Sequence, residues 1–289
     1  MEIAIISGKG GTGKSSISAA FATLSEEVVL ADCDVDAANL FILFNPVHEE
    51  EESFVGGEKA IIDRELCTNC GLCIPYCAFD AISLSSEGVI ISDTACDGCH
   101  LCKRICPHQA IRMIDNDKSR LYSGSFRNGL MVYGRLAPGE ENSGKLVNLV
   151  REKARKQSKA FGMETIIIDG PPGIGCPVIS SITGVDQVVI VTEPSLSGLH
   201  DLKRAADVSG SFGIQTRVII NKADLDEAMS DKIETWCKER GLDIVARIPF
   251  NPEVVEAMVN CKSISEWAPD SETSQILRKT WKEILNGKS

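Results

Sequence analysis

Eight of the twelve cysteines in this chain form two arrays with the same spacing, Cys-x2-Cys-x2-Cys-x3-Cys. A shift of 29 residues, from Cys67 to Cys96, superimposes the two arrays and the Ala-Ile pair that follows each one, which indicates an internal duplication. Cysteines at short, regular spacing are typical metal ligands. Their positions are Cys67, Cys70, Cys73 and Cys77 in the first array and Cys96, Cys99, Cys102 and Cys106 in the second. The arrays therefore predict metal binding.

The spacing also bears on which metal is bound. Zinc uses Cys-x2-Cys pairs as well, but a structural zinc site separates two such pairs by a longer arm. Three cysteines at tight spacing suit one face of an iron–sulfur cube, and the fourth reaches a second cube. The doubled pattern favours iron, and zinc is the alternative.

The two arrays resemble those of bacterial two-cluster ferredoxins, in which the fourth cysteine of each array ligates the other cluster. The resemblance implies two [4Fe-4S] clusters. One is held by Cys67, Cys70, Cys73 and Cys106, and the other by Cys96, Cys99, Cys102 and Cys77. The first array departs from the family at Ala78, where a proline is usual, whereas Pro107 follows the second array.

Composition and charge exclude several classes of protein. A chain of 289 residues with 43% hydrophobic residues has enough length and apolar content for one large domain and one small one. The formal net charge of −11 argues against nucleic acid or an anionic membrane surface as the main partner. No apolar run reaches the roughly 18 residues of a membrane span, and the first residues lack the basic start of a signal peptide. We therefore expect a cytoplasmic protein, in a compartment where structural disulfides are rare.

A glycine-rich loop near the N-terminus predicts phosphate binding. The sequence GKGGTGKSS follows the apolar run EIAIIS and precedes the helical pattern SSISAAFATLS. In this order of strand, loop and helix, backbone N–H groups turn toward phosphate oxygens. Lys14 would reach the β- and γ-phosphates, and Ser15 would bind Mg²⁺. The predicted nucleotide ligands in the loop are Gly8, Lys9, Gly10, Gly11, Thr12, Gly13, Lys14, Ser15 and Ser16.

The loop contains a second lysine, Lys9, five residues before Lys14. In this form, KGGTGKS, it resembles the deviant Walker A motif of the MinD, ParA and nitrogenase iron protein superfamily. The resemblance implies an ATPase that forms a homodimer when ATP is bound. It also implies that Lys9 crosses the dimer interface to the nucleotide of the partner subunit.

Carboxylates complete the predicted site by the same resemblance. Asp34 follows the buried strand pattern at 28–31 and matches the switch I aspartate that positions the attacking water, so it is predicted to be catalytic together with Lys9 and Lys14. Asp169 ends the apolar run TIIID and matches the Walker B and switch II aspartate. The predicted Mg²⁺ ligands are Ser15, Asp36 and Asp169. The division of roles between Asp34 and Asp36 stays open.

Two later segments line the base pocket in this superfamily. They contain Asn221, at the end of the run TRVIIN, and Pro249, in the run ARIPF. The sequence Asn221-Lys222-Ala223-Asp224 also matches the NKxD motif that recognises guanine. The superfamily favours ATP, and the spelling keeps GTP as the alternative.

Apolar runs rich in valine and isoleucine predict a mostly parallel sheet with strands near 2–7, 28–32, 164–169, 187–192, 216–221 and 243–249. Helical patterns alternate with them, and the last one, at 274–289, is expected to pack on the domain rather than on a membrane. The predicted fold is α/β, a P-loop ATPase domain formed by residues 1–56 and 119–289 with a small α+β ferredoxin domain inserted at 57–118. No role is predicted for residues 119–143.

Together these features predict an ATP-hydrolysing iron–sulfur protein that couples homodimerisation to electron transfer with a redox partner protein. The alternative is a cluster carrier or assembly ATPase of the Mrp type. A positioning ATPase like MinD leaves the cysteine arrays unexplained. Cys176, seven residues after Asp169, is expected to be a buried structural residue, although in the nitrogenase iron protein a cysteine at this distance ligates a cluster shared across the dimer.

Overall fold

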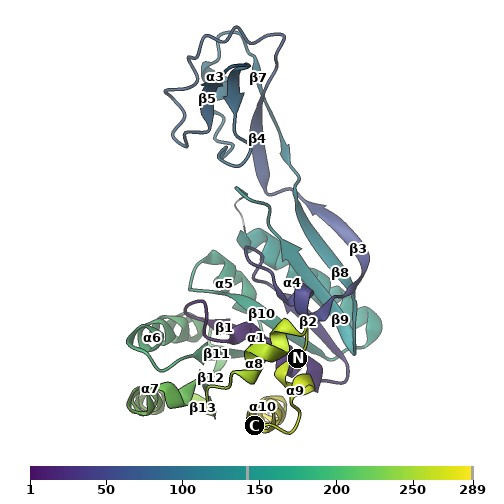
Figure 1. Ribbon diagram of the computed structural model, residues 1–289, viewed down its shortest axis with the longest axis vertical. Helices are drawn as coiled ribbons and strands as arrows, with labels where there is room; N and C mark the ends of the chain where they lie inside the picture. The colour runs from purple at the N-terminus through teal and green to yellow at the C-terminus, as the bar shows by residue number, and fades with distance from the viewer. Residues whose placement is uncertain (141–142, 288–289) are drawn as a thin grey trace.

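The computed structural model describes residues 1–140 and 143–287 (Figure 1). A large lower body contains both ends of the chain, and a smaller upper lobe stands on a narrow arm. The lobe lies in the chain between β3 (Val47–Phe54) and β8 (Ser119–Phe126), so the chain leaves the body, builds the lobe and returns. No helix within the described ranges is long and apolar enough to cross a membrane.

A nine-stranded sheet forms the centre of the described body. Its further strands are β1 Glu2–Ser7, β2 Val28–Asp32, β9 Gly129–Arg135, β10 Thr165–Pro172, β11 Gln187–Thr192, β12 Gln215–Asn221 and β13 Asp243–Ile248. The strand order is β13-β12-β11-β1-β10-β2-β9-β8-β3. Strands from β13 to β9 pair in parallel, whereas β8 is antiparallel to both of its neighbours. The mostly parallel sheet predicted from the sequence is therefore confirmed.

Alternate residues of the strands belong to two hydrophobic cores on opposite faces of the sheet. On β1, Ala4 and Ile6 join the core beneath α4, α5, α6 and α7, whereas Ile3 and Ile5 join the core beneath α1, α9 and α10. This alternation is what a strand between two helical layers requires. The helices of the body are α1 Lys14–Leu24, α2 Leu40–Phe44, α4 Ser143–Phe161, α5 Cys176–Ile182, α6 Leu196–Ser211, α7 Glu227–Glu239, α8 Glu253–Val259, α9 Ile264–Trp267 and α10 Glu272–Asn286, with a 3-10 turn at Ala223–Leu225.

The last helix, α10, packs on the body as predicted. Leu277, Trp281 and Ile284 are buried, and the Trp281 ring stacks on Phe21 of α1 with 4.8 Å between the ring centroids. The apolar face of this helix is therefore used inside the protein. The final residues of the predicted helical stretch, 288–289, lie outside the described residues.

All six predicted strands are present, but the body contains three strands that the sequence did not predict: β3, β8 and β9. β8 and β9 occupy most of the segment 119–143, for which no role was predicted. They form a hairpin, and the Asn128 side chain in its turn donates a hydrogen bond to the Ala22 carbonyl at 3.3 Å. β9 then lies parallel to β2 and widens the sheet.

The upper lobe contains two small antiparallel sheets and one short helix. β4 (Gly57–Ile62) pairs with β7 (Ile111–Asn116), β5 (Ile82–Ser85) pairs with β6 (Gly88–Ile91), and α3 spans Leu101–Ile105.

The two halves of the lobe repeat one backbone pattern. The Asp63 N–H donates to the Ala110 carbonyl at 2.7 Å. At the positions 29 residues away, the Ser92 N–H donates to the Ala81 carbonyl at 2.8 Å. The duplication in the sequence is therefore a duplication of structure, while the predicted domain boundaries stay a prediction.

Candidate nucleotide site and cysteine groups

The glycine-rich loop connects β1 to α1 and borders a cavity at the carboxyl edge of the sheet. Gly13 has a φ of 90°, and a Cβ there would lie 2.2 Å from Asn221 Nδ2, so this position requires glycine. The cavity is lined by Ser7, Gly10, Gly11, Thr12, Gly13, Lys14, Ser15, Ser16, Asp34, Asn39 and Pro172. Gly8 and Lys9, the other predicted loop ligands, lie outside this lining.

Lys14 and Asp169 form a buried ion pair beside this cavity. Lys14 Nζ lies 2.8 Å from Asp169 Oδ2, and the Asp169 side chain is completely buried. The hydroxyl of Ser15 donates to the same carboxylate at 2.7 Å, and that of Ser18 donates at 2.6 Å. The structure thus brings together three residues predicted for phosphate and Mg²⁺ and adds Ser18, which the sequence interpretation missed.

Asp32 is a second buried carboxylate in this site, and the sequence interpretation assigned it no role. It is the register partner of Asp169 on the neighbouring strand. Its oxygens accept hydrogen bonds from the backbone N–H groups of Asp34, at 3.1 Å, and Leu40, at 3.2 Å. Burial and the nearby charge of Asp169 raise the pKa of Asp32 to about 7, against the attraction of Lys14. Its position as the last residue of a buried strand was the available sequence signal.

Asp34 and Asp36 occupy different environments. Asp34 is half-buried and lines the cavity, and burial raises the pKa of its carboxyl while Lys14 opposes that shift. Asp36 is exposed and is not in the lining, and partial burial raises its pKa. Of the two carboxylates, Asp34 is therefore the one on the wall of the loop cavity. The predicted contribution of Asp36 to Mg²⁺ binding stays a prediction.

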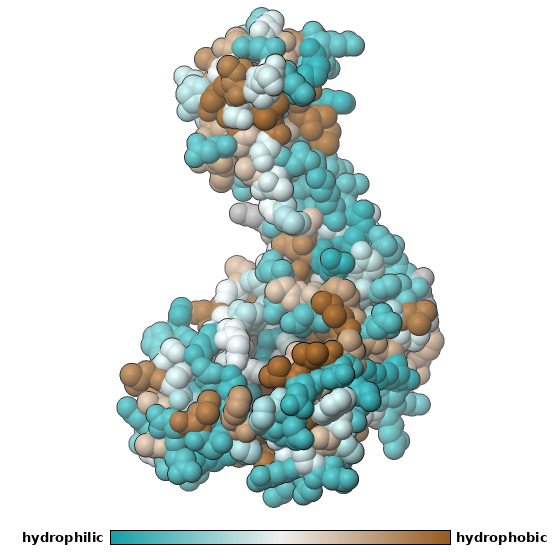
Figure 2. Space-filling view, viewed as in Figure 1, coloured by the Kyte–Doolittle hydropathy of each residue, from teal (hydrophilic) through white to brown (hydrophobic). Residues whose placement is uncertain are grey.

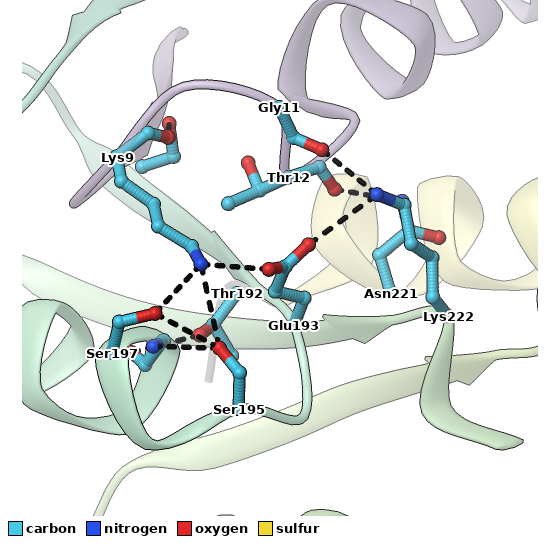
Figure 3. Close-up of polar contacts among 11 residues, drawn as sticks. Lys9, Gly11, Thr12, Thr192, Glu193, Ser195, Ser197, Asn221 and Lys222 are labelled. Atoms are coloured by element: carbon cyan, nitrogen blue, oxygen red, sulfur yellow. Dashed lines mark hydrogen bonds and ion pairs between the residues drawn. The ribbon is translucent and has the colours of Figure 1, made fainter. Parts of the chain in front are cut away.

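The Lys9 side chain points toward Glu193, Ser195 and Ser197, which follow the end of β11 (Figure 3). Its ammonium lies 2.7 Å from Glu193 Oε1 and donates to Ser197 Oγ at 2.8 Å and Ser195 Oγ at 3.4 Å. Glu193 also pairs with Lys222 at 3.3 Å. Glu193 was not predicted, because nothing in the sequence shows which strand end lies beside the loop.

A second cavity lies beyond the loop and suits a nucleotide base. It is mostly apolar, and its lining comprises Gly11, Gly13, Ser16, Ile17, Asn221, Lys222, Ile248, Pro249, Phe250, Asn251, Val254, Val255, Met258, Ile264, Thr273 and Leu277. Asn221 and Pro249 are therefore placed together at this cavity. Asp224 of the NKxD spelling is absent from the lining, and its carboxylate accepts a hydrogen bond from the Phe250 backbone N–H at 2.6 Å.

The array cysteines gather in two groups of four in the upper lobe. Each group borders its own small cavity of about 20 Å³. One cavity is lined by Cys67, Cys70, Cys73 and Cys106, and the other by Cys77, Cys96, Cys99 and Cys102. In each group the fourth cysteine of one array joins the first three of the other, which is the grouping that the sequence predicted.

Backbone N–H groups point at the sulfur atoms of these groups. The Ala81 N–H donates to Cys77 Sγ at 3.3 Å, and the equivalent Ala110 N–H donates to Cys106 Sγ at the same distance of 3.3 Å. Across the described residues, no three His, Cys, Asp or Glu side chains are grouped as ligands of one metal ion.

The remaining cysteines differ in exposure. Cys33 and Cys237 are buried, and burial raises the pKa of both thiols. Cys176 is exposed at the start of α5, so the expectation that it is a buried structural residue was wrong. The reason is that α5 turns its first residue outward and buries Val178 and Ile182 instead.

Known proteins resemble this chain over nearly its full length. An uncharacterized protein of Methanocaldococcus jannaschii is 37% identical over 287 residues, which cover 98% of this chain and 96% of that protein. An uncharacterized ATP-binding protein of the same organism is 23% identical, over 99% of this chain and 88% of that protein.

Solved structures share the fold. The cell division ATPase MinD of Pyrococcus furiosus superposes with a TM-score of 0.57 at 19% identity, over 99% of this chain and 98% of that one. MinD of Pyrococcus horikoshii, solved with Mg-ADP, gives a TM-score of 0.57 at 18% identity, over 99% of this chain and 96% of that one. The model of the CobQ/CobB/MinD/ParA nucleotide binding domain matches residues 3–264. This chain belongs to the CobQ/CobB/MinD/ParA nucleotide-binding family.

Proposed function

We propose that this chain is an ATPase that carries two [4Fe-4S] clusters and couples ATP-dependent homodimerisation to electron transfer. The observation that carries the proposal is the gathering of the array cysteines into two groups of four. These groups lie in a lobe that an arm of strands joins to the body, which contains the candidate nucleotide site (Figure 1).

The donor chemistry of both groups fits a [4Fe-4S] cluster. Each group supplies four thiols around a cavity, and backbone N–H groups directed at Cys77 and Cys106 stabilise the negative charge of bound thiolates. A zinc site would hold four sulfurs within about 2.3 Å of one ion. Four thiolates also suit zinc, so the preference for iron rests on the doubled Cys-x2-Cys-x2-Cys-x3-Cys spacing of the two arrays. Bound clusters would supply one-electron transfer, usually at low potential.

The residues of the body suit ATP hydrolysis. A bound nucleotide would bring its phosphates into the loop cavity, where Lys14 exchanges Asp169 for phosphate oxygens. Ser15 and Asp169, already 2.7 Å apart, would then face the Mg²⁺ ion. Asp34 on the cavity wall would hold the attacking water, and Lys9 would supply charge to the nucleotide of the partner subunit in the ATP-bound homodimer.

A stack of aromatic rings supports a mechanical link between the nucleotide site and the lobe. The segment after Asp34 leads into α2, where Phe41 stacks on Tyr133 of β9 with centroids 5.1 Å apart. Tyr133 stacks on Tyr122 of β8 at 4.9 Å, and Tyr122 packs beside His48 of β3 at 5.3 Å. β3 and β8 continue into the arm of the lobe (Figure 1). A displacement near Asp34 would therefore reach the cysteine groups.

The lobe also offers a surface for a redox partner protein. Apolar residues gather on the upper lobe among polar ones (Figure 2). The large hydrophobic side chains exposed there are Leu66, Leu72, Tyr76, Phe79, Leu84 and Leu101. Apolar side chains next to redox groups suit a transient docking contact, since weak electron-transfer interfaces are small. The proposed place of this exchange is the cytoplasm.

One observation keeps the cluster carrier as a second candidate. Cys70 and Cys99, at equivalent places in the two groups, are exposed. An exposed ligand opens a path by which a cluster leaves for another protein. Electron transfer requires that both clusters stay bound.

The test is anaerobic purification followed by iron and sulfide analysis and ATP hydrolysis by oxidised and dithionite-reduced protein. We expect a rate of hydrolysis that depends on the redox state, with iron retained throughout. Transfer of iron and sulfide to an apo-ferredoxin during hydrolysis would favour the carrier. Stoichiometric zinc without sulfide would contradict both the electron-transfer function and the cluster-carrier function.

A further inference from the structure

The Lys9 ammonium is bound by side chains of its own subunit, and these interactions affect formation of the ATP-dependent dimer. We propose that Glu193 is a positioning residue that retains Lys9 in the nucleotide-free subunit, so that its release sets the protein concentration at which ATP-dependent dimers form. This inference rests on the proposed function, in which Lys9 acts on the nucleotide of the partner subunit.

All the hydrogen-bonding capacity of the Lys9 ammonium is used within the subunit. A lysine ammonium has three donors, and Lys9 directs them to Glu193 at 2.7 Å, Ser197 at 2.8 Å and Ser195 at 3.4 Å (Figure 3). No donor is left for a phosphate. Lys9 therefore cannot contact a nucleotide, in either subunit, before some of these interactions break.

Glu193 is the strongest of the three partners. It carries the only charge among them, and its side chain is 22% exposed while that of Lys9 is 29% exposed, so solvent screens the pair only in part. Burial alone would raise the pKa of Glu193, but hydrogen bonds from Lys9 and Lys222 hold it below its ordinary value. The carboxylate is therefore charged at neutral pH and attracts Lys9 throughout.

The second lysine connects this contact to the base pocket. Lys222 lines that pocket, donates to the Gly11 carbonyl of the loop at 2.9 Å and reaches Glu193 Oε2 at 3.3 Å. Glu193 thus lies between the lysine of the base pocket and Lys9 (Figure 3). A nucleotide that attracts Lys222 or repels the carboxylate with its phosphates would loosen Lys9.

The experiment removes the charge of Glu193 and keeps its size. For wild type and Glu193→Gln, the ATP hydrolysis rate per chain is measured against protein concentration, and dimer formation is followed by sedimentation with a non-hydrolysable ATP analogue. We expect Glu193→Gln to lower the concentration of half-maximal hydrolysis about fivefold, the size of a partly screened ion pair. Added salt should reduce this difference, because screening weakens the wild-type pair.

Two further variants make the test specific. Ser197→Ala removes an uncharged partner of Lys9 and leaves Lys222 untouched, so we expect the same direction with about a twofold change. Glu234→Gln on α7 is the matched control, since Glu234 also pairs with two cations, Lys238 at 2.8 Å and Arg247 at 3.2 Å, away from the loop. It should leave the concentration dependence unchanged.

The inference is overturned if Glu193→Gln and Ser197→Ala both leave the half-maximal concentration unchanged or both raise it. It is also overturned if Glu193→Gln loses dimers as Lys9→Ala does, because Glu193 would then support the active position of Lys9. Failure of the proposed function gives a different result. In that case wild type itself forms no ATP-dependent dimer.

Discussion

The reactive side chains of the body and those of the lobe differ in the partners that they contact. In the body, the charged groups of the nucleotide site are paired with one another, as Lys14 is with Asp169 at 2.8 Å and Lys9 is with Glu193 at 2.7 Å. In the lobe, eight thiols surround two cavities and meet few polar partners other than backbone N–H groups. The loop lysines of the body thus have partners within the chain, whereas the thiols of the lobe line the two cavities where the proposed clusters would bind.

The body and the lobe also differ in how much hydrophobic core they contain. Both large cores lie in the body, on either side of the sheet. In the lobe the buried apolar residues are few and mostly small, namely Ala60, Ala81, Ile82, Val89, Ala110 and Ile111. A unit of this size with so little core usually needs a metal or disulfides for stability. We therefore expect the stability of the lobe to depend on the proposed clusters, and that of the body to be independent of them.

The largest expected effect is loss of metal from the lobe. We predict about eight iron and eight sulfide ions per chain, and about four of each after Cys73→Ala, which removes a ligand of one cluster. Cys102→Ala, at the equivalent position of the other half, should give the same loss. Cys237→Ala, in the core of the body, is the control and should keep all the iron.

Limited proteolysis of the same variants tests the comparison directly. After iron is chelated, we expect cleavage within the lobe and protection of the body, because only the lobe lacks a core of its own. A chelated protein that resists cleavage in the lobe would show that the lobe folds without metal.

The next effect concerns the paired charges of the body. Lys14→Ala should reduce ATP hydrolysis at least about a hundredfold, since it removes the charge that stabilises the transferring phosphoryl group. It should also destabilise the nucleotide-free protein by about 3 kcal/mol, because Asp169 is left buried and unpaired. Denaturant unfolding measures this loss. A variant as stable as wild type would mean that other groups around Asp169 compensate its charge.

Lys9→Ala separates the two lysines. We expect this variant to bind ATP but to lose hydrolysis and the ATP-dependent dimer, because Lys9 lies outside the loop cavity of its own subunit. Equilibrium binding, sedimentation and phosphate release measure the three properties. Normal hydrolysis by Lys9→Ala would contradict a role for Lys9 in the partner subunit.

How far the sequence predicted this site depends on whether the signal was local. The glycine loop, six strands and the cysteine spacing are local patterns, and all appear where they were expected. The contacts of Glu193 and Asp32 are not local, although Asp32 ends a predicted strand. They meet Lys9 and Asp169 only because β1 lies between β10 and β11 and because β10 lies beside β2. The order of the strands in a sheet cannot be inferred from their order along the chain. The exposure of Cys176 was not predicted either, because it depends on how α5 packs against the rest of the body.

A smaller effect is expected for the choice of base. We predict a preference for ATP over GTP, because the Asp224 carboxylate is held by the Phe250 N–H at 2.6 Å and does not line the base pocket. Competition of ATP and GTP against a fluorescent nucleotide measures the preference. Asp224→Ala should leave it unchanged. A strong preference for GTP that Asp224→Ala abolishes would place the carboxylate on a guanine base.

The smallest expected effect concerns Asp32. This carboxylate is buried in the body, and its negative charge is only partly offset by Lys14, so it differs from the paired charges of the nucleotide site. Its pKa is raised from the ordinary value of 3.8 to about 7 in the folded protein. Between these two values the folded protein binds more protons than the unfolded one, so the stability that Asp32 contributes is present at low pH and is lost as pH rises toward about 7. Asp32→Asn, a neutral replacement of the same shape, should remove this slope.

Thermal unfolding from pH 5 to pH 8, without nucleotide or Mg²⁺, measures the slope. We expect the unfolding temperature of Asp32→Asn to exceed that of wild type by a small amount near pH 5 and by several degrees more at pH 8. Asp243→Asn, at an exposed position of β13, should follow wild type throughout. Parallel curves for Asp32→Asn and wild type would mean that Lys14 compensates both Asp32 and Asp169.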